Sequence, residues 1–474
     1  MAIYIVGLIG SVASLSMNWV VLGSVGGLTV RPSDIFAGML IVSVLCLKGK
    51  RPIAILTFGP ARMLAIAFLF YLGALLLSLI TGRFSGAGIA LIAKHAMRFG
   101  VFLVLTELFL TVEFSRSRLI ALLLFGSALG LAVFVAAATI MLGWKVIPEY
   151  TQAVVSGDIR ALQFGFYPRL FSTLSVESPT SLRNALCGSF CVYFFVGTSA
   201  IANTRTDRWN WQRTVALLTA ILSLFLVAAS VSRSNLLILI AGIACFFLQF
   251  ALALGQRAAR IPRSVVVACL ILMATSLAIV VPQVERLPEI ATSYSHRVES
   301  IGSDGRVHML NVAGNAIAGN WLLGRGAAST FQFQRSTSQF HNMILAGWYE
   351  AGLLGLTSTV FFCATIGILL LRFVSVADTS LKPSAHYWLA GLAFLPLVRT
   401  QVGGQGGMLS CNDWFALSVL LVFQFNSAAT KSTLGYRIKR KRSISSQLVG
   451  AMKATRFRPI SAKRYAMTDE NSQA

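Results

Sequence analysis

Charged residues are scarce in this sequence of 474 residues, because Asp, Glu, Lys and Arg make up only 12% of it and hydrophobic residues make up 56%. A typical soluble domain carries about 25% charged residues. Too few polar side chains are present to cover soluble surfaces, which excludes a soluble enzyme and a disordered chain. Acidic residues are the scarcest: 16 Asp and Glu against 40 Lys and Arg leave a formal net charge of +24. In a membrane protein such an excess mainly reports topology.

Motifs for nucleotides, metals and redox chemistry are missing as well. The sequence contains no Walker-type phosphate loop and no dinucleotide fingerprint, and its seven cysteines form no CxxC pair and no Cys/His cluster. We therefore expect neither a metal nor a cofactor. The first residues, MAIYIVGLIG, have no basic residue before their apolar run, so they predict a membrane span and not a removable signal peptide.

Long apolar runs recur along the chain, and a spanning helix needs about 20 mostly apolar residues. The runs predict an all-α polytopic membrane protein with twelve transmembrane helices. The expected spans are 3–24, 34–48, 61–81, 87–112, 118–143, 184–203, 213–231, 235–255, 264–283, 342–371, 384–399 and 412–427.

The distribution of Lys and Arg predicts how these spans are oriented. Connections after even-numbered spans are rich in basic residues, whereas those after odd-numbered spans are short or dilute in them. Because basic residues gather in cytoplasmic connections, we expect both termini in the cytoplasm and two long periplasmic loops, 144–183 and 284–341, the second between helices 9 and 10. The membrane bundle, 1–427, is followed by a basic tail, 428–474, expected to be disordered. Topology and attraction to anionic lipid explain this tail, so no nucleic-acid partner is expected.

The most specific string lies in the second long loop and the start of the next span, residues 305–356. It combines an Arg, a glycine-rich turn, a His-Asn pair and a Glu followed by glycines: Arg306, Gly324, Gly326, His341, Asn342, Glu350, Gly352 and Gly355. Two further stretches accompany it. SVSRSNLLILI, residues 230–240, places Arg233 at the outer end of the eighth span, and YPRLFSTLSVESPTSLRNAL, residues 167–186, precedes the sixth span.

Together these stretches resemble the signatures of the superfamily of O-antigen ligases and polysaccharide polymerases, bacterial membrane glycosyltransferases that use undecaprenyl-diphosphate-linked sugars. The resemblance covers the transmembrane pattern and residues 165–360, although Ser178 stands where the family often has Asn or His. It implies glycan transfer at the outer face of the bacterial inner membrane. The implied partners are an undecaprenyl-diphosphate-linked glycan, an acceptor glycan and the lipid bilayer, with a flippase and a chain-length regulator as further candidates.

Elementary chemistry suggests compatible roles for three residues. A departing lipid diphosphate is stabilised by preorganised cations, and the planar fork of Arg binds phosphate oxygens in a bidentate manner. Arg233 and Arg306 are the candidates for this task, with an interfacial position as the alternative for Arg233. An acceptor hydroxyl needs a base. His341 is the candidate base, because the positive end of the helix that it begins favours a neutral imidazole; a capping His is the alternative.

Further substrate contacts are expected from Arg169, Asn342, Lys94 and Arg98. Lys94 and Arg98 lie four residues apart and therefore share one helical face. They would either attract a phosphate or an anionic glycan, or extend from an interfacial segment.

Glu350 follows His341 by nine residues, so in a regular helix the two side chains would face opposite ways about 13 Å apart. We therefore expect a structural role for Glu350 in the bundle. Glu299 and Asp304 lie in the same loop as Arg306 and are better placed to assist, but nothing ranks them above solvated loop residues.

The sequence leaves three functions open. Polymerisation of undecaprenyl-diphosphate-linked repeat units into exopolysaccharide or O-antigen is preferred, and ligation of the finished glycan to lipid A core is the first alternative. A flippase or transporter of lipid-linked oligosaccharides would also show twelve spans and cationic residues within a bundle, but no convincing internal repeat is present.

Overall fold

The computed structural model divides the chain into two units, Met1–Phe425 and Asn426–Ala474. All the residues that it describes belong to the first unit. They are residues 2–17, 20, 22–25, 28–33, 35–36, 38–39, 42, 59–81, 86–111, 115–156, 179–204, 210–230, 232–256, 314–315, 317–327, 329, 342–375, 382–402 and 409–424.

Five helices in these described ranges are long and apolar enough to cross a membrane. They lie within α4 (Gly59–Thr81), α5 (Gly86–Thr111), α6 (Arg116–Leu142), α10 (Pro179–Asn203) and α17 (Met343–Ser375). Shorter apolar stretches lie in α11 (Trp211–Ala229), α12 (Arg233–Gln256) and the helix Cys411–Gln424. Helices satisfy their own backbone hydrogen bonds in lipid, and the chain is a helical membrane protein.

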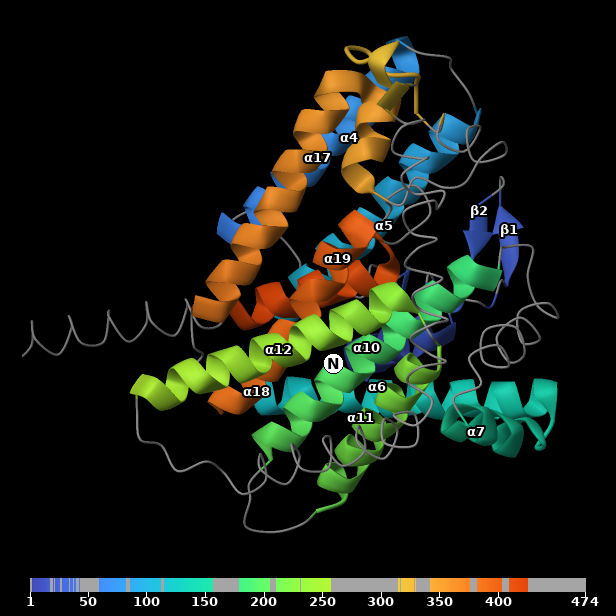
Figure 1. Ribbon diagram of the computed structural model, residues 1–474, viewed down its shortest axis with the longest axis vertical. Coiled ribbons are helices and arrows are strands. Elements are labelled where there is room, and N and C mark those ends of the chain that lie inside the picture. The colour runs from blue at the N-terminus through green and yellow to red at the C-terminus, as the bar shows by residue number, and fades with distance from the viewer. Residues whose placement is uncertain are drawn as a thin grey trace, which may run out of the picture. The chain divides into compact units, whose positions relative to one another are not determined.

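The exposed side chains of α4 and α17 follow the pattern expected of lipid-facing surfaces. On α4 the exposed apolar residues recur at helical spacing, at Ile66, Leu69, Phe70, Leu76, Leu77 and Ile80. On α17 they form a similar row: Leu353, Val360, Phe361, Ile368 and Leu371. The two helices pack side by side (Figure 1). Apolar rows of this length would be costly in water, whereas the hydrocarbon of a bilayer accommodates them.

The N-terminal segment differs from the expected first span. The helix α1 (Ala2–Ser14) and a 3-10 turn η1 (Leu15–Met17) are followed by two short antiparallel strands, β1 (Gly23–Val25) and β2 (Leu28–Val30). The prediction of one helix over 3–24 is therefore wrong beyond residue 17. In the sequence two glycines separate the strands, and glycine pairs favour two-residue hairpin loops.

Two of the expected C-terminal spans are interrupted. The span predicted over 342–371 is not one regular helix, because α17 breaks at Ala351 and Gly352. The span predicted over 384–399 consists of α18 (Pro383–Ala390), a 3-10 turn η3 (Gly391–Ala393) and α19 (Phe394–Val402). Hydropathy detects apolar length but not such breaks, which explains why both were predicted as continuous.

Several predicted segments fall outside the described residues. The spans over 34–48, apart from five positions, and 264–283 lie there, as does the tail 428–474. Within the first predicted periplasmic loop the described part contains the helix α7 (Val146–Ser156). Within the second it contains residues 314–327 with one gap, and residue 329.

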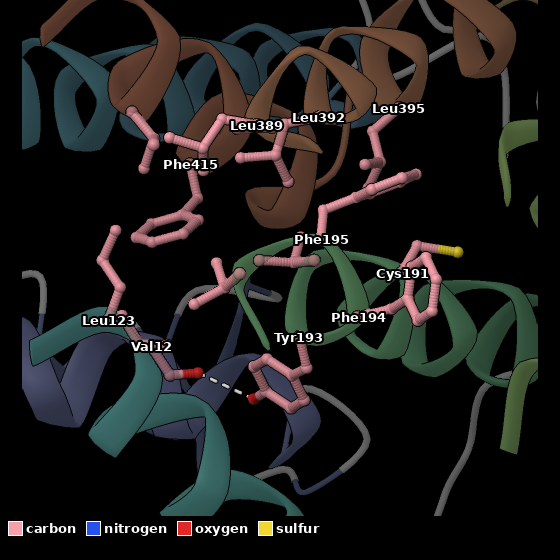
Figure 2. Packing of buried hydrophobic residues seen from close by; sticks show 14 of the residues in the cluster. Val12, Leu123, Cys191, Tyr193, Phe194, Phe195, Leu389, Leu392, Leu395 and Phe415 are labelled. Atoms are coloured by element: carbon pink, nitrogen blue, oxygen red, sulfur yellow. Dashed lines mark hydrogen bonds between the residues drawn. The ribbon is translucent and has the colours of Figure 1, made fainter. Parts of the chain in front are cut away.

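Helix α10 is the centre of the larger hydrophobic cluster. Every residue from 186 to 200 is buried, as expected for a helix surrounded by others. Figure 2 shows Phe195 directed toward Leu395, and Tyr193 with its hydroxyl donating to the carbonyl oxygen of Val12 at 2.7 Å. The same hydroxyl accepts from the backbone N–H of Ser16 at 3.1 Å. The N-terminal helix is thereby attached to the central one.

A second cluster joins α4, α5, α17 and the helix Cys411–Gln424. Its centre is the buried indole of Trp414, which contacts the rings of Phe68, Phe99 and Phe102 at centroid distances of 4.8, 5.6 and 5.1 Å. These tilted and edge-on arrangements are the favoured ones for aromatic pairs. The cluster fixes α5 and the last described helix, which carry several of the candidate residues, against α4.

Candidate functional site

The break in α17 divides it into a short half, 343–350, and a long half, 353–375. Gly352 has φ +62° and ψ −147°, a conformation that side-chain-bearing residues avoid. In a continuous helix Gly347 and Gly355 would be about 12 Å apart. Instead they are in contact, because a Cβ atom on Gly355 would overlap the carbonyl oxygen of Gly347. The short half therefore folds back along the long half.

The glycine-rich turn singled out in the sequence docks against this break. The backbone N–H groups of Arg325 and Gly326 donate to the carbonyl oxygens of Tyr349 and Glu350, both at 2.9 Å. These two carbonyls lie at the C-terminal end of the short half. The N–H of Leu353, which starts the long half, donates to the carbonyl oxygen of Leu322 at 3.1 Å. We term this arrangement, 322–326 bonded to 349–353, the clamp.

Glycine at 324 is required by the clamp in two ways. Its φ is +74°, which disfavours residues with a Cβ atom, and a Cβ atom there would lie 2.5 Å from both the oxygen of Glu350 and the nitrogen of Gly352. The glycines of the string thus have a structural explanation. Two groups of motif residues that are far apart in the sequence therefore form one unit: 324 and 326 in the turn, and 350, 352 and 355 in α17.

Asn342 sets the start of the short half. Its Oδ1 accepts hydrogen bonds from the backbone N–H groups of Ile344 and Leu345 at 2.8 and 3.2 Å. This is the geometry of a helix N-cap. Asn342 was expected to contact substrate, and the structure gives its side-chain oxygen a capping role. His341, which precedes the cap directly in the sequence, lies outside the described residues, as do Arg306 and Arg169.

The three basic residues of α5, Lys94, His95 and Arg98, have different surroundings. His95 is buried against α4, with its ring 5.5 Å from that of Tyr71 and 6.2 Å from that of Phe68. Arg98 is half-buried, and its Nη1 donates to the carbonyl oxygen of Leu409 at 3.0 Å. Lys94 is also half-buried. Arg98 therefore holds the segment that enters the helix Cys411–Gln424.

Arg233 is the first residue of α12, at the helix start expected from its sequence context. Serines surround this start. The N–H of Ser232 donates to Oγ of Ser230 at 3.2 Å, and the amide of Asn235 donates to Oγ of Ser232 at 2.8 Å. Ser230, Ser232 and Asn235 are all buried. A buried helix N-terminus among polar side chains is suited to an anion, because the helix dipole favours negative charge there.

The start of the helix Cys411–Gln424 is a second buried polar site. The carboxylate of Asp413 accepts from the N–H and the hydroxyl of Ser410 at 2.6 and 2.7 Å. On the neighbouring α10, the hydroxyl of Ser189 lies 3.2 Å from Oδ1 of Asn412. Neither Asp413 nor Asn412 is exposed. Sequence reasoning did not select these residues, although the run SCND before an apolar helix was the available signal.

The N-terminal ends of α12 and of the helix Cys411–Gln424 both contact α10, at positions of α10 that lie within one helical turn of each other. Ser189 contacts Asn412, and two residues later the thiol of Cys191 lies 3.6 Å from the carbonyl oxygen of Asn235. Arg98 binds the residue before Ser410. Helix α10 thus contacts both helix starts, through Ser189 and Cys191.

Glu350 is buried at the end of the short half. The structural role expected for Glu350 stays a prediction. Glu299 and Asp304 lie outside the described residues. His386, which carried no functional prediction, is stacked on Phe373 at 4.3 Å and bonded to its carbonyl oxygen.

Among the described residues no group of three or more His, Cys, Asp or Glu side chains could hold a metal ion. No protein-family model matches the sequence, and a search of curated proteins found no match. The fold and composition therefore define the class of the protein, a helical membrane protein with a clamped, broken helix.

Proposed function

We propose that the protein is a metal-independent membrane glycosyltransferase. It polymerises undecaprenyl-diphosphate-linked oligosaccharide repeat units into exopolysaccharide or O-antigen at the periplasmic face of the bacterial inner membrane. The proposal includes twelve spans with both termini in the cytoplasm. The observation that supports it most directly is that the described parts of the string 305–356 meet in the clamp, so this string behaves as one structural unit.

In the proposed reaction the acceptor hydroxyl attacks the anomeric carbon of the donor glycan. The bond between that carbon and the diphosphate oxygen breaks, and the lipid diphosphate leaves with the electron pair. His341 takes the proton of the hydroxyl, and Arg233 and Arg306 neutralise the departing diphosphate. Asn342 supports this role for His341, because its cap determines where the short half of α17 begins.

Three residues have supporting roles in this proposal. Arg98 and the N-terminus of α12 provide a guanidinium and backbone N–H groups of the kind that hold phosphate oxygens. Lys94 lies one helical turn from Arg98 and adds positive charge on the same face. Arg169 is the proposed contact in the first periplasmic loop.

The test measures glycan transfer in membrane preparations supplied with labelled, outward-facing lipid-linked repeats. His341→Ala and Arg233→Ala should each reduce the rate by about 100-fold or more. His308→Ala, in the same loop, and Arg118→Ala, at the start of α6, are matched controls that should retain transfer. Undiminished transfer by both site variants would refute the site. If label extends only after lipid A core is added, the enzyme is a ligase and polymerisation is wrong.

A flippase or transporter is the second candidate, and one observation favours it. Interrupted membrane helices are typical of transporters, where they line the substrate site, and α17 and the segment α18–α19 are both interrupted. The same assay distinguishes the two. A transporter would move labelled repeats across sealed vesicles without forming any new glycosidic bond, and loss of the protein would leave single repeats on the inner side.

A further inference from the structure

Three consecutive apolar residues are exposed next to the clamp. Trp321, Leu322 and Leu323 keep 52, 53 and 62% of their surface accessible. Runs of exposed apolar residues in a loop are unfavourable in water and occur where another surface covers them. We term residues 321–323 the apolar tip.

Hydrogen bonds on both sides hold the apolar tip in its exposed position. The N–H of Gly324 donates to the carbonyl oxygen of Asn320 at 2.8 Å, which closes a turn around the tip. The indole N–H of Trp348 donates to the carbonyl oxygen of Trp321 at 3.1 Å, and the clamp bonds Leu322 to Leu353. The tip therefore cannot retreat into the protein without breaking the clamp.

The apolar tip continues the lipid-facing row of α17. That row begins at Leu353, whose backbone is bonded to Leu322. From Leu353 the exposed apolar residues run along the long half to Leu371. If the row faces the hydrocarbon, the tip lies at its end, where the hydrocarbon gives way to lipid head groups.

A positively charged residue, Arg325, lies beside the apolar tip, as expected at the membrane interface. The side chain of Arg325 is exposed, and its guanidinium lies 5.6 Å from the centre of the Tyr349 ring. Trp is enriched at membrane interfaces, and Arg is attracted to lipid phosphates there. We propose that the apolar tip is inserted into the interface of the bilayer, among the first carbons of the lipid chains, with Arg325 at the level of the lipid phosphates.

This insertion fixes the depth of the break in α17. Because the tip and the break are joined by backbone hydrogen bonds, the short half and its cap at Asn342 stay at a constant distance from the membrane surface. The inference concerns a contact with lipid and does not depend on glycosyl transfer.

A spin label measures the depth directly in the full-length protein, reconstituted into nanodiscs of phosphatidylethanolamine and phosphatidylglycerol. A label at Leu323→Cys, in a variant whose seven native cysteines are replaced, should collide more with oxygen and less with a water-soluble nickel chelate than one at Gln152→Cys. Gln152 is an exposed control on α7. A label at 323 as accessible to the chelate as the control overturns the proposal. A label shielded from both reagents also overturns it, because a second copy or a protein partner would then cover the tip.

A second measurement needs no cysteine replacement. Brominated lipid chains quench tryptophan within the bilayer, so wild type and Trp321→Phe are compared in nanodiscs with and without bromine. The difference between the emission of wild type and that of Trp321→Phe is the emission of Trp321. Brominated chains should quench this difference strongly. If that component is unquenched, the tip is not in the bilayer.

Discussion

The clamp predicts a large effect for Gly324→Ala. The new Cβ atom would start 2.5 Å from two backbone atoms, and contacts below 3.0 Å are essentially absent from real structures. The backbones must therefore separate by at least 0.5 Å, the difference between 3.0 and 2.5 Å. Overpacking of this kind costs about 1–3 kcal/mol, and a positive φ costs an alanine about 1–2 kcal/mol more. We expect Gly324→Ala to lower the free energy of unfolding by about 2–5 kcal/mol.

Gly143 offers a matched control for the positive φ alone. It has φ +80°, and a Cβ atom there would meet nothing within 4 Å. Its ψ of 162° places it in a region that essentially only glycine adopts, so Gly143→Ala should lose only the conformational part, about 1–3 kcal/mol. Both variants are compared with wild type by thermal and denaturant unfolding in the same detergent.

Hydrogen exchange locates the effect of Gly324→Ala. The amides of Arg325 and Gly326 are protected by their bonds to the end of the short half, so they should exchange faster in Gly324→Ala and at the normal rate in Gly143→Ala. If Gly324→Ala is no less stable than Gly143→Ala and exchange at these two amides is unchanged, the clamp as described is wrong.

Three further variants test other parts of the structure. Asn342→Ala removes the cap of the short half and should cost about 0.5–2 kcal/mol in unfolding measurements, whereas Asn342→Asp should retain stability; equal losses would contradict the cap. Arg98→Leu removes the donor to a carbonyl before the last described helix and should lower stability by about 1–3 kcal/mol; Arg118→Leu, on an exposed side chain, is the control. Tyr193→Phe breaks the bonds to Val12 and Ser16 and should cost about 1–3 kcal/mol; unaltered unfolding would show that these bonds contribute nothing.

Much of the helical pattern could be predicted from the sequence, because hydrophobic runs of spanning length are recognisable without knowledge of their neighbours. Helices α4, α5, α6 and α10 begin and end within a few residues of the predicted spans. The hairpin after Met17 and the break at Gly352 were not predicted. The break depends on a backbone conformation that glycine permits, and hydropathy does not distinguish a glycine that bends the chain from one that packs in a helix.

The candidate site was predicted less completely than the fold. The sequence indicated that Asn342, Gly324 and Arg98 matter, but it did not indicate that Asn342 caps a short half-helix or that Arg98 binds a backbone carbonyl. The role of Arg98 depends on a contact with Leu409, 311 positions away in the chain. The cap of Asn342 is local, to Ile344 and Leu345, but the resemblance led us to expect a substrate contact instead. The buried Asp413 was missed although its bonds to Ser410 are local, because the predicted span 412–427 included it within an apolar run.

The glycines of the clamp, and those at 347 and 355 where the two halves of α17 touch, limit which substitutions this chain can accept during evolution. At positions 324, 352 and 355 the space for a side chain is occupied by the backbone of another segment, whereas at 347 a Thr359 methyl group is the nearest atom. A smaller neighbouring side chain can make room at 347, but no substitution elsewhere can make room at the other three. We expect homologous chains to retain glycine at 324, 352 and 355, and to vary at 347 only together with 359.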